Sequence, residues 1–289
     1  MAGRRSFPTR AAIQLAFIVL VLVGVFVLEG NAERWCPFGG AEAIYTYVHE
    51  GNMPCSLQVS NFFMLGGVLL SVLLLRRAFC GYACPVGAIS EWTHRLGRAL
   101  GLKARSVSRP TDRILSLLKY AVLALLLVLT WRTGELIFRG YDPCYALISR
   151  HGEDIQVWAY VVLGVVLLGS LVVSIPFCRW LCPLGALLNP FSRFGWWRVR
   201  RVESACSGCG MCSRVCPMEI PIDEVEVVTH ARCTACMECV SSCPRSGRGA
   251  LDIRTRAPRA FVVGSLLVLL AAPVFASYLL PLPSFRWSR

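Results

Sequence analysis

The stretch FCGYACPVGA at residues 79–88 recurs, with small changes, as FCRWLCPLGA at residues 177–186. Each copy follows a long apolar run and contains the pattern CxxxCP. The chain has 289 residues, of which 55% are hydrophobic and 16% charged, and its mean hydropathy is +0.57. This composition is too apolar for an ordinary soluble domain, and it predicts that the repeated stretch belongs to a membrane protein.

Five apolar runs have the length of a transmembrane helix, or nearly so, at residues 11–28, 62–75, 114–131, 157–175 and 260–280. The second run is short, and it reaches a spanning length only if Arg76 and Arg77 snorkel toward the membrane interface. Lys119, near the start of the third run, is expected to snorkel in the same way. The runs predict five transmembrane helices.

Lys and Arg residues concentrate in alternate connecting segments. Three precede the first run, eight lie in residues 76–113 and twelve in residues 176–259, whereas the intervening segments hold one, three and two. The positive-inside rule then predicts a multi-pass protein of the cytoplasmic (inner) membrane, with its N-terminus in the cytoplasm and its C-terminus outside. The net charge of +13 is therefore interpreted as a topology signal, and nucleic acid is not an expected partner.

The chain contains fifteen cysteines, and their spacing indicates their chemistry. Residues 206–217 read CSGCGMCSRVCP and residues 233–244 read CTACMECVSSCP. Both follow the CxxCxxCxxxCP spacing with which bacterial ferredoxins bind 4Fe–4S clusters, while zinc sites are the competing interpretation. No cysteine group reads CxxCH, and none of the four His lies in an apolar run, so haem is not expected.

In two-cluster ferredoxins the fourth cysteine of each run binds the other cluster, so crossed ligand sets are predicted. The first 4Fe–4S cluster is expected to bind Cys206, Cys209, Cys212 and Cys243. The second is expected to bind Cys233, Cys236, Cys239 and Cys216. The small residues Gly208, Gly210 and Ala235 would let backbone N–H groups approach the cluster sulfides, and His230 is expected to be a surface residue.

The CxxxCP pairs carry half of a ferredoxin run: Cys80, Cys84, Cys178 and Cys182. Pro85 and Pro183 are expected at the first position of the helices that follow, with Cys84 and Cys182 as N-caps. A thiol at a helix N-terminus is biased toward the thiolate, which binds metals. Three interpretations remain open: buried structural thiols, a dithiol switch in the reducing cytoplasm, and a joint metal site, such as a further iron–sulfur cluster.

The order of helix, external loop, helix and CxxxCP turn occurs at residues 11–88 and again at residues 114–186. Such parallel repeats predict a pseudo-two-fold axis along the membrane normal, which would bring both turns to the same depth. The predicted fold is an all-α integral membrane bundle with an inserted α+β two-cluster ferredoxin domain. Its parts are a membrane domain (1–200), the ferredoxin-like domain (201–256) and a C-terminal transmembrane helix (257–289).

Together with a CPFGG motif at residues 36–40 and a YDP motif at residues 141–143, these features resemble a known family. It comprises the NapH-type quinol dehydrogenase membrane subunits, the membrane half of the nitrous oxide reductase electron donor and methylamine-utilisation relatives. The resemblance implies electron exchange between the quinone pool and a partner redox subunit of a larger complex. The chain departs from the family pattern in the predicted fifth helix, and in showing no flavin-binding domain before the first helix.

The loops assigned to the outside contain Cys36, Cys55 and Cys144. A Cys36–Cys55 disulfide and an external metal or cluster site that includes Cys144 are the two interpretations. A quinone site needs an apolar slot with a proton acceptor, and each candidate could equally be a solvated loop group. The candidates are His49, Glu50, Glu135, Asp142, His151 and Glu153 outside, and Glu91 and His94 inside.

The favoured function is that of a membrane-bound iron–sulfur electron-transfer subunit of an oxidoreductase complex, embedded in lipid and linked to quinone. One alternative is a metal-ion reductase or an assembly factor of a respiratory complex. Another is a membrane anchor whose clusters are only structural. The sequence leaves open the terminal substrate and the direction of electron flow.

Overall fold

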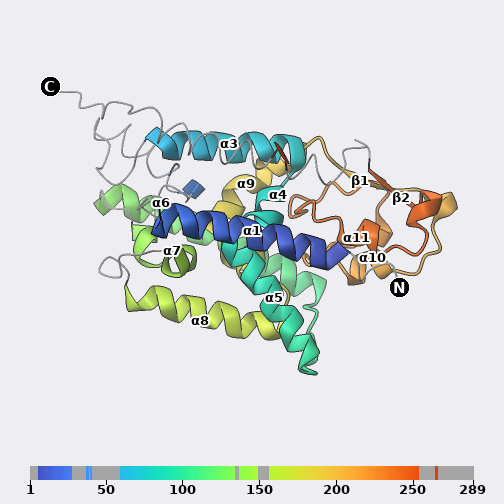
Figure 1. The fold of residues 1–289 in the computed structure, drawn as a ribbon, viewed down its shortest axis with the longest axis horizontal. Coiled ribbons are helices and arrows are strands. Elements are labelled where there is room, and N and C mark those ends of the chain that lie inside the picture. Colours follow the sequence, from blue (N-terminus) through green and yellow to red (C-terminus); the bar gives the residue numbers. More distant parts are fainter. Residues whose placement is uncertain are drawn as a thin grey trace.

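A computed structural model of the chain describes residues 6–27, 37–38, 40, 59–133, 137–148, 156–253 and 264–265. The described part is mostly helical and has one small two-stranded sheet (Figure 1). Helices α1, α3 and α8 extend along the long axis of the molecule, and the two strands lie at one end of it (Figure 1).

Four long helices occupy four of the five predicted apolar runs: α1 (Ser6–Phe26), α3 (Val59–Leu75), α6 (Arg109–Thr133) and α8 (Val157–Val172). Among the described residues, two segments are long and apolar enough to cross a membrane, Thr9–Phe26 and Arg109–Thr130. The apolar parts of α3 and α8 are shorter, at Met64–Leu75 and Val157–Val172. The fifth predicted helix, at residues 260–280, lies outside the described residues except for 264–265.

Helices α6 and α8 expose apolar side chains on their outer faces. Ile114 is 69% and Leu125 58% exposed on α6, and Val165 is 63% and Leu168 67% exposed on α8. Contiguous exposed apolar surface of this kind is rare on soluble monomers and is typical of helices that face lipid.

The two CxxxCP turns are each followed by an amphipathic helix. After α3 the chain forms α4 (Ala78–Tyr82) and α5 (Pro85–Ala99), and after α8 it forms a π-helical turn (Phe177–Leu181) and α9 (Pro183–Phe194). Cys84 and Cys182 are the N-cap residues of α5 and α9, each with proline at the first helical position. These caps confirm the local prediction, because proline tolerates the first turn, where its missing N–H costs nothing.

The repeats pack reciprocally. Helix α3 of the first repeat contacts α9 of the second, and α8 of the second contacts α5 of the first. The N–H groups of Trp196 and Trp197, just after α9, donate to the carbonyls of Leu73 (2.9 Å) and Leu74 (3.1 Å) at the end of α3. Each repeat therefore supplies the helix that covers the other.

Replacing Gly97 with alanine is expected to lower stability by roughly 1–3 kcal/mol, because over-packing forces helices apart. A Cβ atom on Gly97 would overlap the carbonyl oxygen of Leu171, a backbone atom where α5 crosses α8. Gly164→Ala in α8 is the control, since its Cβ would meet nothing within 4 Å in the described structure. Thermal unfolding should separate the two variants; equal melting temperatures would contradict the close approach of α5 and α8.

The segment after α9 forms the ferredoxin-like part. Strand β1 (Val199–Arg201) pairs antiparallel with β2 (Leu251–Ile253), with Arg200 opposite Asp252. Between them lie the short helices α10 (Met211–Arg214) and α11 (Glu238–Ser241) and 3₁₀ turns at Glu203–Ala205, Ile222–Glu224 and Ser246–Arg248. One hydrophobic core joins this part to the helices, with Trp197 1% exposed at the junction. The remaining described elements are a 3₁₀ turn (Ile137–Gly140) and α7 (Pro143–Ile148).

Three basic side chains do not snorkel as predicted. Arg76 and Arg77 are 0% exposed and Lys119 is 1% exposed. The Nζ of Lys119 lies 5.5 Å from the centre of the Tyr120 ring. The prediction was wrong because the ferredoxin-like part and α9 cover the helix ends where these side chains would have met the interface.

Candidate iron–sulfur sites

The ferredoxin-like part contains two pockets, each lined by four cysteines. Cys206, Cys209, Cys212 and Cys243 surround one, with an empty volume of about 360 Å³. Cys216, Cys233, Cys236 and Cys239 surround the other, with an empty volume of about 390 Å³. The chain thus brings the fourth cysteine of each run to the pocket of the other run. His230, beside the second run, is exposed, as expected.

The two cysteine loops have the same backbone shape. Gly208 and Gly210 adopt positive φ angles of 69° and 65°, and the equivalent residues Ala235 and Met237 adopt 51° and 63°. A side chain at positive φ is strained, so its presence at both positions of the second loop indicates that the fold requires this curl. Such curls turn successive N–H groups inward and create an anion-binding concavity.

The donor sets fit clusters better than single ions. Within the described residues, no group of three or more His, Cys, Asp or Glu side chains is arranged to hold one metal ion. A zinc site needs four donors converging at about 2.3 Å from a point, whereas here the thiols surround a space. All-thiolate donor sets around such a space match the requirements of iron–sulfur clusters.

The four CxxxCP cysteines line a third cavity, which is apolar and lies among the helices. Its lining includes Cys80, Cys84, Cys178 and Cys182. The empty volume of this cavity is about 920 Å³. The duplication therefore places both turns at one site, which distinguishes this arrangement from two separate structural thiol pairs.

The glycine position of each CPxG turn has no space for a side chain. A Cβ on Gly87 would lie 2.8 Å from the carbonyl oxygen of Cys80, and a Cβ on Gly185 would lie 2.5 Å from the guanidinium of Arg77. The N–H of Gly185 donates to the Sγ of Cys182 at 3.3 Å. The N-terminus of α9 thus directs a backbone donor at sulfur, as ligand-supporting groups do.

The predicted bias of the N-cap thiols toward thiolate is wrong for the chain on its own. Burial raises the pKa of Cys182 to about 11, although the N–H of Gly185 acts to lower it. Burial likewise raises the pKa of Cys84 well above its ordinary value. Desolvation outweighs the helix terminus here, so a bound metal is what would keep these thiols ionised.

The first turn packs directly on the second cysteine loop. A Cβ on Gly81 would lie 2.7 Å from the carbonyl oxygen of Thr234, so the two backbones touch. The hydroxyl of Tyr82 donates to the carbonyl oxygen of Cys236 at 3.3 Å. The third cavity is therefore adjacent to the pocket of Cys236, whereas Cys209, at the other ferredoxin pocket, is exposed.

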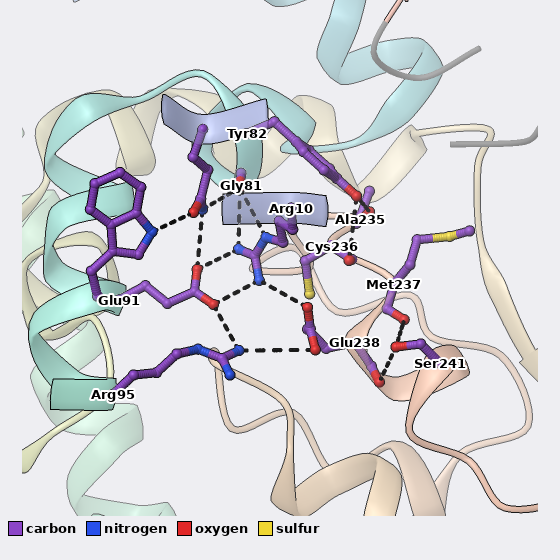
Figure 2. A network of polar contacts seen from close by, with 12 residues as sticks. Arg10, Gly81, Tyr82, Glu91, Arg95, Ala235, Cys236, Met237, Glu238 and Ser241 are labelled. Carbon is purple, nitrogen blue, oxygen red and sulfur yellow. Dashed lines mark hydrogen bonds and ion pairs between the residues drawn. The ribbon is translucent and has the colours of Figure 1, made fainter. Parts of the chain in front are cut away.

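A buried ion-pair network ties α1 to α5 and α11 (Figure 2). The guanidinium of Arg10 lies 2.7 Å from the carboxylate of Glu91 and 3.8 Å from that of Glu238. All three side chains are at most 4% exposed. Arg10 also donates to the carbonyl oxygen of Gly81 at 3.2 Å (Figure 2). From the sequence, Arg10 was counted only as one of the positive charges that predict membrane topology, and Glu91 was a candidate for a quinone site. The ion pair between them was not predicted.

A second network ties the second turn to α6 and to the ferredoxin-like part. Arg179 and Arg232 each donate to Asp112 at 2.6 Å, and the indole N–H of Trp180 donates to the same carboxylate at 2.9 Å. Arg179 also pairs with Glu219 at 2.8 Å. A single carboxylate at the start of α6 thus fixes the second turn against the segment that precedes Cys233.

The remaining candidate residues divide between described and undescribed parts. Cys144 and Asp142 line the third cavity, and the N–H of Cys144 donates to Asp142 at 2.9 Å. The ring Nδ1 of His94 lies 3.1 Å from the carbonyl oxygen of Ser170, and His94 does not line that cavity. The candidates outside the described residues are Cys36, Cys55, His49, Glu50, Glu135, His151 and Glu153.

Two protein-family models match the chain. The model described as a 4Fe-4S binding domain matches residues 57–103 and 155–203, which contain the two CxxxCP turns. The model described as a 4Fe-4S dicluster domain matches residues 198–244. The cysteine-lined pockets and these matches define an iron–sulfur protein with ferredoxin-type domains and apolar helices. No solved structure matches.

Proteins of similar sequence identify the family to which this iron–sulfur protein belongs. The uncharacterized protein MJ0750 of Methanocaldococcus jannaschii is 31% identical over 80% of this chain and 89% of its own length. The ferredoxin-type protein NapH of Haemophilus influenzae is 27% identical over 84% of this chain and 88% of its own. The putative electron transport protein YccM of Escherichia coli is 30% identical over 74% of this chain, and the match spans 62% of YccM. The chain belongs to the NapH-like polyferredoxin family, as its motifs predicted.

Proposed function

We propose that this chain is a membrane-bound iron–sulfur subunit that relays electrons between the quinone pool and a partner redox subunit. The observation that carries the proposal is the occurrence of three cysteine-lined sites in one chain. The relay would begin at the apolar cavity among the helices, continue through the buried pocket of Cys236 and end at the pocket beside the exposed Cys209. The names of YccM and NapH, an electron transport protein and a ferredoxin-type protein, support the same role.

In this proposal each pocket holds one cluster. Cys206, Cys209, Cys212 and Cys243 would ligate the outer 4Fe–4S cluster, and Cys233, Cys236, Cys239 and Cys216 would ligate the inner one. Cys80, Cys84, Cys178 and Cys182 would together ligate a further cluster in the third cavity. When bound, such clusters store and return single electrons. The chain's own residues hold them, exclude water from the inner sites and supply N–H groups to the sulfur ligands.

The lining of the third cavity also suits a quinone head group. Its empty volume of about 920 Å³ is more than twice that of either ferredoxin pocket. Pockets that bind small organic molecules are mostly apolar and have a few polar groups. Here Phe17, Met64 and Phe138 supply apolar walls, and Asp142 supplies a carboxylate that is 6% exposed. Quinol oxidation releases two electrons and two protons, and in this proposal Asp142 would accept one of the protons.

We assign the ferredoxin-like domain to the cytoplasmic side. The start of α1, the end of α3 and the start of α6 all contact this domain, and each lies in a basic segment. The positive-inside rule favours the cytoplasm for such segments. Residues 1–200 would form the membrane domain and residues 257–289 a last helix with an external C-terminus. The exposed Cys209 pocket would then meet its partner in the cytoplasm.

Anaerobic reduction of the purified protein by a water-soluble quinol analogue tests this function. The visible absorbance of the clusters should decrease after the quinol analogue is added, and a quinone analogue should restore it. In the Cys80→Ser/Cys178→Ser variant, iron and sulfide should fall by about a third, because one of three clusters is lost. Quinol should then no longer reduce the ferredoxin clusters, although dithionite still should.

Two further variants test whether Asp142 takes part in the reaction with quinol. Asp142→Asn should slow quinol reduction by about 10-fold or more, because a proton acceptor is lost. His94→Gln should leave the rate unchanged, since His94 does not line the cavity. Unchanged iron and sulfide in the double serine variant would refute the third cluster. Clusters that quinol cannot reduce in the unaltered protein would favour a structural anchor instead.

A further inference from the structure

Arg77 differs from the other buried arginines of the described structure. Arg10 pairs with Glu91, and Arg179 and Arg232 pair with Asp112. The neighbour of Arg77 in sequence, Arg76, donates to the backbone carbonyls of Val228 and His230. Three of these side chains have a carboxylate partner, and Arg76 has two carbonyl acceptors, although the Nε atoms of Arg76 and Arg179 have no hydrogen-bond partner among the described residues.

The guanidinium of Arg77 has far weaker protein partners. It is 0% exposed, and within the described structure its Nη1 donates a hydrogen bond to the amide oxygen of Asn189 at 3.2 Å. Its Nε and Nη2 atoms have no hydrogen-bond partner among the described residues. A buried cation without an anion costs several kcal/mol, so a native fold that retains one indicates a missing negative partner.

The surroundings of Arg77 identify that partner by its chemistry. Its charge interacts with the thiols of Cys80, Cys178 and Cys182. Its Nη2 occupies the space that a Cβ of Gly185 would fill, at 2.5 Å, so the second turn is shaped around the guanidinium. An all-thiolate metal cluster is the anion that these residues can assemble.

We propose that Arg77 is the internal counter-charge of the four-cysteine site and a positioning residue for the group bound there. With the site loaded, its two spare nitrogens would donate hydrogen bonds toward the sulfur ligands, and its charge would stabilise the state that carries the additional electron. Reduction of the site adds one electron and breaks no bond, so the positive charge favours the reduced form. This role rests on the proposed cluster of Cys80, Cys84, Cys178 and Cys182.

The backbone of Arg77 also joins this site to the next one. Its N–H donates to the carbonyl oxygen of Cys233 at 3.4 Å, and its carbonyl accepts from the N–H of Cys80 at 3.0 Å. One residue therefore connects a cysteine of the membrane site to a cysteine of the inner ferredoxin pocket. Arg77 therefore lies between the four-cysteine site and the inner ferredoxin pocket, which are neighbouring sites of the proposed electron relay.

Redox titration followed by electron paramagnetic resonance tests the role of Arg77. The signal to be followed is the one that the Cys80→Ser/Cys178→Ser variant lacks. Arg77→Gln should move the midpoint potential of this signal to a more negative value, or remove the signal together with about a third of the iron. Arg77→Lys keeps the charge and should retain the signal with a smaller shift.

Arg76→Gln is the matched control, because Arg76 is equally buried and adjacent but bonds to backbone carbonyls. It should leave the potential of this signal unchanged. An unaltered signal and potential in Arg77→Gln would overturn the role of Arg77, and so would an equal shift in Arg76→Gln. A double serine variant that keeps all of its iron would instead overturn the four-cysteine cluster itself.

Discussion

Replacing Cys216 with serine is expected to remove the cluster of the second cysteine run and to spare that of its own run. Cys216 follows Cys212 in sequence, yet it lines the pocket of Cys233, Cys236 and Cys239. Loss of one thiolate from a four-cysteine set removes or strongly weakens that cluster, so about a third of the iron should be lost if three clusters are present.

Double variants show which cluster is affected. Cys216→Ser combined with Cys233→Ser should lose no more iron than Cys233→Ser alone, because both residues serve one cluster. Cys216→Ser combined with Cys206→Ser should lose about twice as much, because two clusters are affected. Iron and sulfide analysis of the purified variants measures this. The reverse pattern would mean that each run binds its own cluster without crossing.

Glu91→Gln is expected to destabilise the protein by about 3–5 kcal/mol, because it leaves the buried Arg10 without its nearest anion. The Arg10–Glu91 distance is 2.7 Å, and the two side chains are only 2% and 4% exposed. Helix α1 is held to α5 through this pair and to α11 through the contact of Arg10 with Glu238 (Figure 2). Denaturant unfolding in detergent should show a lower free energy of unfolding than for the unaltered protein. The ferredoxin-like part should detach at a lower denaturant concentration.

Glu224→Gln provides the comparison for Glu91→Gln. Glu224 pairs with Arg109, but these side chains are 51% and 71% exposed. Exposed pairs contribute little to stability, since water screens them. Similar unfolding curves for the two variants would show that the Arg10 network adds little to the attachment of the ferredoxin-like part.

The sequence was most informative where local chemistry determines the outcome. The CxxxCP spacing predicted that Cys84 and Cys182 cap helices, because proline and a helix start depend only on neighbouring residues. The apolar runs predicted the position of α1, α3, α6 and α8 to within a few residues. The structure also brings Cys216 and Cys243 to the pockets that the crossed ferredoxin pattern anticipated.

The sequence was least informative about the charged residues. Counting Lys and Arg by segment gives a topology, but it treats every positive charge alike. Arg10, Arg77 and Lys119 are buried because segments distant in sequence cover them, which no count can reveal. The signal available beforehand was the position of Arg76 and Arg77 directly before the first CxxxCP turn, where two charges interrupt an apolar segment.

The two CxxxCP turns differ where their neighbours differ. Gly81 in the first turn corresponds to Arg179 in the second. Glycine lets the first turn touch the Thr234 backbone, while Arg179 reaches the carboxylate of Asp112. The two turns are therefore not interchangeable: exchanging Gly81 and Arg179 would place a long cation where there is no space and leave Asp112 with one arginine fewer. The first turn meets the ferredoxin-like part by backbone contact, whereas the second is held by ion pairs to Asp112 and Glu219, so two nearly identical sequences are attached in two different ways.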